Sequence, residues 1–168
     1  MGTMRTSGVV AASATALLTF LTMHPAHALG PIDVEVAGKV GYGTNYYGLG
    51  LGARAGISFL GLYGGVNFIN YFGQGQNGLP AESAFTFGGE VGYGIKIAFV
   101  TIRPLVGLGV EQLGTTDSGN QSFYIEPGGL VQFGFGHFIF GVEASALLPT
   151  TNAYSKAFTF GGQIGARF

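Results

Sequence analysis

The sequence contains no cysteine and no tryptophan, and only 9% of its 168 residues are charged. The absence of cysteine excludes disulfides, a thiol nucleophile and a Cys-ligated metal site. The charged fraction is far below the roughly one quarter that is usual in soluble domains. The formal net charge of −1 argues against nucleic acid as a partner, because phosphate binding requires a basic surface.

Long apolar runs are scarce as well. After residue 28 no run of about 18 apolar residues occurs, so we expect no membrane-spanning helix there. Glycine is abundant instead, with 32 residues, and phenylalanine and tyrosine contribute 15 and 8. A chain that is too apolar for water and too interrupted for a spanning helix is typical of a transmembrane β-barrel.

The first 28 residues are predicted to form a cleaved secretory signal peptide. Arg5 supplies the positive start, residues 9–21 are apolar, and Ala26-His27-Ala28 has the small-residue pattern of a cleavage site. The apolar stretch is short for the alternative, an uncleaved helical anchor. Residues 29–168 would then form one barrel domain in which His137 is the only histidine.

Period-2 alternation of apolar and polar residues runs through most of this domain and predicts strands. Eight strands are expected, at residues 32–43, 47–60, 62–71, 84–97, 100–112, 122–135, 138–148 and 157–168. Each is long enough to cross a bilayer, which takes about 9–11 tilted residues. Short turns at Leu60-Gly61, Ala98 and Gly136-His137 alternate with the longer loops 70–84, 113–121 and 149–156. The fold class is therefore predicted to be all-β, an eight-stranded antiparallel up-and-down transmembrane barrel.

The charged residues of the predicted strands lie opposite the bulky apolar residues of the same strand. A soluble barrel would turn that polar face to water and would have very few surface charges for its solubility. A membrane barrel turns it into the lumen, where unpaired charges are costly and are expected to pair. We expect Arg54 near Glu90 or Glu126, with further bases pairing with Glu35, Glu111 and Glu143. The predicted lumen network comprises Asp33, Glu35, Lys39, Arg54, Glu90, Lys96, Arg103, Glu111, Glu126, Glu143 and Arg167.

Aromatic residues crowd the ends of the predicted strands, where they are expected to anchor the barrel at the membrane interface. They are Tyr42, Tyr46, Tyr47, Tyr63, Tyr71, Phe72, Phe99, Phe123, Tyr124 and Phe138. The inward glycines allow two interpretations: they make room for long side chains, or they leave a narrow file of water.

The last strand ends on Phe168 and has apolar residues at every second position before it, among them Ile164 and Phe160. This ending resembles the C-terminal signature of bacterial outer-membrane barrels, in which the last strand is read by the barrel-insertion machinery. The phrases GLYGGVNF at 61–68 and RPLVGLGVE at 103–111 resemble small OmpA-type barrels. The resemblance implies the outer membrane of a Gram-negative bacterium, membrane lipid and the insertion machinery as partners, and a monomer.

No enzymatic constellation is evident. His137 is the only candidate base for the lipid-modifying chemistry of some small barrels. It falls at a tight turn on the predicted periplasmic side, whereas those enzymes work near the outer leaflet. We therefore predict no catalytic residue, no cofactor and no metal site. The expected function is a structural or surface-interaction role with a salt-bridged, largely plugged lumen. The alternative is a narrow pore or small-solute conduit.

Overall fold

The computed structural model describes residues 32–74, 83–114, 121–151 and 156–168, and these form nine strands. No helix in this part of the chain is long and apolar enough to cross a membrane. The predicted signal peptide and most of the three longer loops lie outside the described residues. The strands are β1 Ile32–Gly43, β2 Gly48–Phe59, β3 Leu62–Tyr71, β4 Ala84–Tyr93, β5 Ile95–Ile97, β6 Val100–Leu113, β7 Gln121–Phe135, β8 Phe138–Pro149 and β9 Ala157–Arg167.

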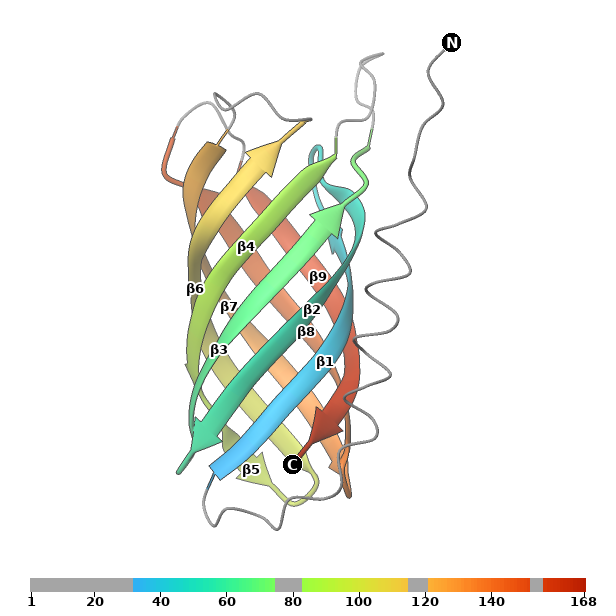
Figure 1. Ribbon diagram of the computed structural model, residues 1–168, viewed down its shortest axis with the longest axis vertical. Coiled ribbons are helices and arrows are strands. Elements are labelled where there is room, and N and C mark those ends of the chain that lie inside the picture. The colour runs from blue at the N-terminus through green and yellow to red at the C-terminus, as the bar shows by residue number, and fades with distance from the viewer. Residues whose placement is uncertain (1–31, 75–82, 115–120, 152–155) are drawn as a thin grey trace.

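The strands form a closed antiparallel barrel (Figure 1). Apart from β4 and β5, strands that follow one another along the chain pair with each other, and β1 pairs with β9 to close the sheet. β4 and the short β5 both pair with β6 and act as one barrel strand interrupted at Gly94. The barrel therefore has eight strands, as predicted, and the bounds agree with the expected ones within a few residues.

Three tight turns lie at one end of the barrel, which we call the turn end; the opposite end is the loop end. Gly61 and Gly136 adopt positive φ angles of 88° and 61° in two of these turns. The third turn has no glycine, and Ala98 itself adopts a φ of 54°. Left-handed backbone is uncommon for a residue with a side chain, and without a glycine this turn has less sequence signal than the other two.

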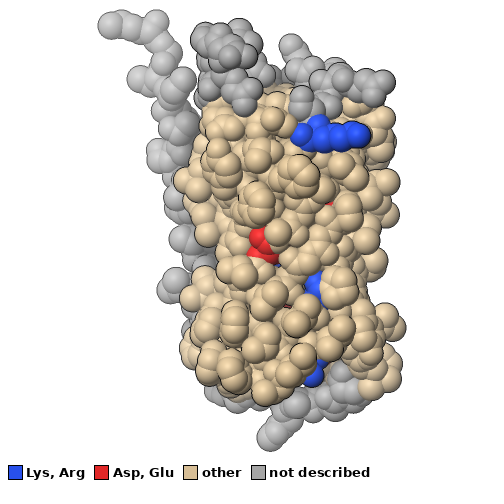
Figure 2. All heavy atoms as spheres, turned by 180° about the vertical axis from the view of Figure 1, so that it is seen from behind, with Lys and Arg blue, Asp and Glu red and all other residues tan. Residues whose placement is uncertain are grey.

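Alternate residues of every strand face opposite sides of the barrel wall. The outward residues are mostly large apolar side chains that remain exposed, such as Leu51, Val66 and Val142. Figure 2 shows one face of this wall, on which hardly any charged atoms appear. The charged residues Glu35, Arg54, Glu90 and others are buried in the lumen instead. This distribution is the reverse of a soluble protein, in which charged residues are almost never fully buried unless they are paired.

Candidate functional site in the barrel lumen

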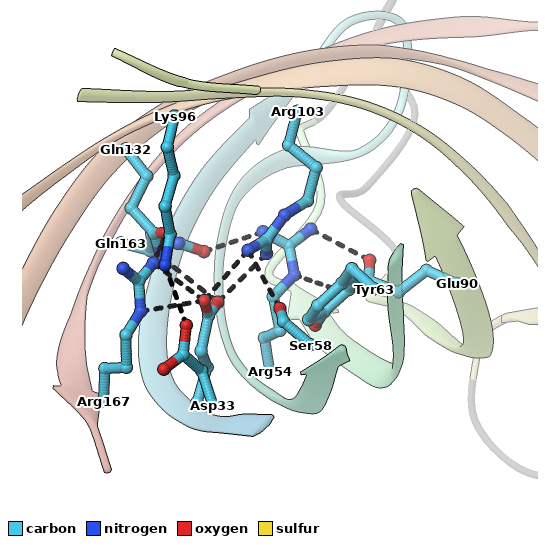
Figure 3. Close-up of polar contacts among 11 residues, drawn as sticks. Asp33, Arg54, Ser58, Tyr63, Glu90, Lys96, Arg103, Gln132, Gln163 and Arg167 are labelled. Carbon is cyan, nitrogen blue, oxygen red and sulfur yellow. Dashed lines mark hydrogen bonds and ion pairs between the residues drawn. The ribbon is translucent and has the colours of Figure 1, made fainter. Parts of the chain in front are cut away.

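The first group of lumen contacts lies near the turn end and is centred on Glu35. Figure 3 labels its partners Arg103, Gln132 and Arg167. Arg103 from β6 donates from Nη1 to Glu35 Oε2 at 3.0 Å and from Nη2 to Oε1 at 2.9 Å. Arg167 from β9 donates to Oε1 from Nη2 at 2.8 Å, and Gln132 from β7 donates to Oε2 at 3.4 Å. The Glu35 carboxylate therefore connects β1 to side chains of β6, β7 and β9.

The second group occupies the middle of the barrel and is balanced in charge. Arg54 Nε lies 2.5 Å from Glu90 Oε1, and Arg54 Nη1 lies 2.8 Å from Glu143 Oε2. Lys39 Nζ lies 2.5 Å from the other oxygen of Glu143. Arg54 also donates to Gln163 Oε1 at 2.7 Å. Two bases therefore face two acids. Arg54 donates hydrogen bonds from Nη1 and Nη2, whereas its Nε is close to Glu90 but makes no hydrogen bond.

Two lumen glutamates have no basic partner among the described residues. Glu111 is fully buried and accepts a hydrogen bond from the phenol of Tyr47, while its Oε1 has no partner. Glu126 accepts from Ser145 at 2.6 Å and from Thr159 at 3.3 Å. Of the two acids expected beside Arg54, the structure places Glu90 there, and the expected basic partner of Glu111 is replaced by a tyrosine.

The partner of Glu111 comes from the connection between β1 and β2, which turns into the loop end of the lumen. Tyr47 is fully buried there and packs edge-on against Tyr71, with ring centroids 5.1 Å apart. Burial, together with the hydrogen bond to Glu111, raises the pKa of the Tyr47 phenol, so it stays a protonated donor. An apolar cluster surrounds these rings and comprises Tyr47, Ile69, Tyr71, Ala84, Tyr124, Leu147 and Ala157. The loop end of the lumen is thus packed with side chains.

Four tyrosines that were expected at the membrane interface lie in the lumen: Tyr47, Tyr63, Tyr71 and Tyr124. The expectation was wrong for these residues because it considered position along the strand and ignored which face they occupy. Tyr124 has the same parity as Glu126, so its inward direction was available from the sequence. Phe72, Phe99, Phe123 and Phe138 are exposed, as expected.

The lumen glycines make room for these rings. A Cβ at Gly56 would lie 2.5 Å from the ring of Tyr63, and Gly65 lies against the same phenol. A Cβ at Gly43 would lie 2.6 Å from Tyr47 Cβ. Tyr63 uses this space to donate to Glu90 Oε1 at 2.8 Å, while Arg103 stacks on its ring at 4.0 Å. These glycines therefore accommodate side chains and do not line an empty channel.

The sequence argument followed charges and missed the uncharged polar residues of the lumen. Ser58, Asn67, Thr101, Gln132 and Gln163 are all buried there. The parity of Ser58, Thr101, Gln132 and Gln163 matches that of the charged residues on the same strands, and this signal could have found them. β3, which carries Asn67, has no charged residue that could have given this signal.

A cavity of about 290 Å³ lies at the turn end, beside the Glu35 group. Its lining includes Lys96 and Asp33, whose Nζ and Oδ2 atoms are 3.0 Å apart and which form the most exposed ion pair among the described residues. Lys96 was expected within the lumen, and the structure places it at the mouth. The remaining lining residues are Glu35, Ser58, Leu60, Gly61, Tyr93, Gly94, Thr101 and Arg103.

His137 packs into the turn between β7 and β8. Its Nδ1–H donates to the backbone carbonyl of Arg167 at 3.1 Å, and its ring lies against Phe168. Phe160 and Ile164, the other residues of the predicted insertion signal, point outward from β9 and are exposed. Within the described residues no group of three or more histidine, aspartate or glutamate side chains is arranged to hold a metal ion.

An exposed apolar wall around a buried, charged lumen defines the chain as an eight-stranded barrel of the outer-membrane type. More particularly, it has the fold of the small OmpA-type barrels, as three solved structures show. No family model and no curated protein matches the sequence.

The first of these structures is the N-terminal β-barrel domain of Pseudomonas aeruginosa OprF. It is 13% identical, with a TM-score of 0.61 over 81% of this chain and 97% of that one. Neisserial surface protein A (NspA) is 14% identical, with a TM-score of 0.54 over 82% and 96%. Ail, the attachment invasion locus protein of Yersinia pestis, solved with the heparin analogue sucrose octasulfate, is 14% identical, with a TM-score of 0.51 over the same shares.

Proposed function

We propose that the protein is a small integral outer-membrane barrel that is not an enzyme, whose lumen is plugged and whose loop end faces the outside of the cell. The single observation that carries this proposal is the inverted distribution of polarity. Large apolar side chains are exposed on the outer wall, and paired charges are buried inside. A hydrocarbon environment stabilises such an outer wall, whereas water would not.

Three groups of contacts support the proposal of a plugged lumen. Arg103, Glu35 and Arg167 join opposite walls near the turn end, and Arg54 joins Glu90 to Glu143 in the middle. The packed cluster around Tyr47 fills the loop end. The interior of an eight-stranded barrel is just wide enough for side chains to fill.

A structural or surface-interaction role would then fall to the loop end and its connections. Two of the structural neighbours are described as a surface protein and an attachment invasion protein, which agrees with this role. Membrane lipid would cover the outer wall of a monomer. Phe160 and Ile164 on the outward face of β9, together with Phe168 directly after it, would be read by the barrel-insertion machinery during biogenesis.

The orientation can be tested because the chain has no cysteine. Thr150 is exposed at the loop end and His137 is exposed in a turn at the opposite end. We expect a membrane-impermeant maleimide added to intact cells to label Thr150→Cys and to leave His137→Cys unlabelled, whereas both react after lysis. Labelling of His137→Cys on intact cells would show the opposite orientation. Labelling of neither variant in lysed cells would contradict the exposure of both positions and with it the proposed topology.

A narrow conduit is the second candidate, and the cavity at the turn end favours it because it already occupies part of the lumen. Single-channel recording in a planar bilayer separates the two candidates, with heat-modified gel mobility as proof of folding. A plugged lumen predicts that folded protein gives no steady conductance. Discrete conductance that changes in Arg54→Ala would make the conduit the primary function.

A further inference from the structure

A cavity and a groove meet at the turn end of the barrel, one inside the wall and one outside it. The cavity has a volume of about 290 Å³, at the lower limit of ligand pockets, which span roughly 300–1,000 Å³. The groove has about 420 Å³ and is lined by exposed apolar side chains such as Leu62, Val91 and Val106. Tyr93 lines both of them. One molecule with a small polar group and an apolar chain would therefore fit the two together.

The wall between the cavity and the groove is interrupted. β4 pairs with β6 as far as Gly92, and β5 resumes the pairing only at Ile95. Tyr93 and Gly94 lie between these positions and pair with no residue of β6. The N–H of Gly94 donates instead to the carbonyl of Gly61, in the turn between β2 and β3, at 2.7 Å. The cavity and the groove thus adjoin the one place where this barrel strand leaves its neighbour.

The cavity is balanced in charge, with two acids and two bases among its lining residues. One pair is closed, because Arg103 donates to both oxygens of Glu35 and the two side chains are 2% and 3% exposed. The other pair is accessible, since the side chains of Lys96 and Asp33 are 59% and 31% exposed. Their hydrogen bond uses one of the three N–H groups of the ammonium and one carboxylate oxygen. The cavity therefore offers a ligand one base and one acid side by side.

This pair favours a ligand that carries both charges. A ligand with a single charge is attracted by one member of the pair and repelled by the other. A group with an ammonium and a phosphate suits both, because Asp33 accepts from the ammonium and Lys96 donates to the phosphate. An exposed ion pair contributes little to stability, so exchanging it for two contacts with the ligand costs little. Figure 3 shows Lys96 and Asp33 reaching toward one another from β5 and β1.

We propose that the turn end of the barrel binds a single zwitterionic phospholipid, whose headgroup carries an amine and a phosphate. The headgroup lies at Lys96 and Asp33 in the cavity. One acyl chain passes Tyr93 and lies in the outer groove against Leu62 and Val91. The lipid then has its headgroup at the end of the barrel and its chain along the wall, as a membrane lipid does. The inference rests on the proposed function only in that the outer wall contacts lipid, and it does not depend on which end faces outside.

The test uses the absence of tryptophan from the chain. Tyr93→Trp places a fluorophore where the cavity and the groove meet, and Phe138→Trp places one on the exposed wall at the same end of the barrel. Each variant is folded into vesicles of equal parts phosphatidylethanolamine, which is zwitterionic, and phosphatidylglycerol, which is anionic, with the same acyl chains. Bromine, which quenches tryptophan fluorescence, is placed on the chains of one lipid at a time.

We expect brominated phosphatidylethanolamine to quench Tyr93→Trp more strongly than brominated phosphatidylglycerol does, with a ratio of binding constants of about threefold or more. Phe138→Trp should be quenched equally by the two lipids. Heat-modified gel mobility confirms that each variant is folded. If Tyr93→Trp does not fold, Leu62→Trp replaces it, because Leu62 lines the same groove and is 63% exposed.

A charge variant locates the headgroup. Asp33→Asn, made in the Tyr93→Trp background, leaves two bases and one acid in the cavity and should abolish the preference for the zwitterionic lipid or turn it toward the anionic one. Lys156→Gln, which removes an exposed charge at the loop end, is the control and should leave the preference unchanged.

Equal quenching of Tyr93→Trp by the two lipids would overturn the proposal, as would an unchanged preference in Asp33→Asn. The same preference in Phe138→Trp would also overturn it, because the wall as a whole would then select the lipid. Quenching of neither tryptophan variant would contradict the membrane barrel itself, and the lipid site with it.

Discussion

Replacing Glu90 by glutamine removes one negative charge from the middle of the lumen with little change in shape. Arg54 would lose the charge partner of its Nε and Nη2 atoms, at 2.5 and 2.9 Å. It would keep Glu143 at 2.8 Å, but that carboxylate is shared with Lys39. Two buried bases would then depend on one acid.

The cost follows from the burial of the pair. Removing one partner of a buried ion pair typically destabilises a protein by about 3–5 kcal/mol. Since Glu143 remains beside Arg54, and the new amide oxygen still accepts from Tyr63, the lower limit applies. We expect Glu90→Gln to lower the free energy of unfolding by about 3 kcal/mol.

Glu111→Gln is the matched control, because Glu111 is equally buried but has no base beside it among the described residues. The amide oxygen can still accept from Tyr47, and a buried negative charge is removed. We expect its free energy of unfolding to stay within about 1 kcal/mol of wild type, or to rise.

Both variants are compared by equilibrium urea unfolding in lipid vesicles, followed by far-UV circular dichroism, because the chain has no tryptophan to report on folding. Equal destabilisation by the two substitutions would refute the reasoning, since burial alone would then decide the cost. So would a Glu90→Gln variant as stable as wild type, because the lumen pairs would then contribute nothing.

Two further substitution pairs test the wall and the packing. Gly65→Ala places a Cβ 2.7 Å from the Ala55 carbonyl oxygen and against the phenol of Tyr63. It should lower the free energy of unfolding by about 1–3 kcal/mol. Gly64→Ala, whose Cβ has no neighbour within 4 Å, should stay within about 0.5 kcal/mol of wild type. Val66→Lys, outward and in the middle of β3, should cost about 2–4 kcal/mol in vesicles, and Phe123→Lys near the loop end about 0–1 kcal/mol. A barrel outside the membrane would tolerate both lysines alike.

Strand positions were predictable because alternation is a local property. The wall requires a large apolar residue at every second position, and charges mark the opposite face, so the expected bounds differ from the observed ones by few residues. The interruption at Gly94 was not predicted. It leaves the alternation unchanged across the break, with Lys96 still opposite Ile95 and Ile97, so the sequence carries no trace of it.

The partners inside the lumen were less predictable. Which acid meets Arg54 depends on the register of strands that are far apart in the sequence, and the chain alone does not fix the tilt of the barrel. Glu111 illustrates the limit: its partner Tyr47 lies on a connection that folds inward. No local pattern distinguishes such a connection from one that stays at the surface.

The fit between tyrosine rings and lumen glycines has a practical consequence for anyone who wishes to turn this barrel into a nanopore. Tyrosine rings fill part of the lumen beside the ion pairs, so trimming Tyr63 or Tyr47 should widen the lumen locally, because each ring packs against glycine backbone. The opposite change, a methyl group added at Gly56 or Gly65, should displace the Tyr63 ring. It should therefore destabilise the barrel rather than narrow its lumen. Calibre in this barrel is thus adjustable in one direction only.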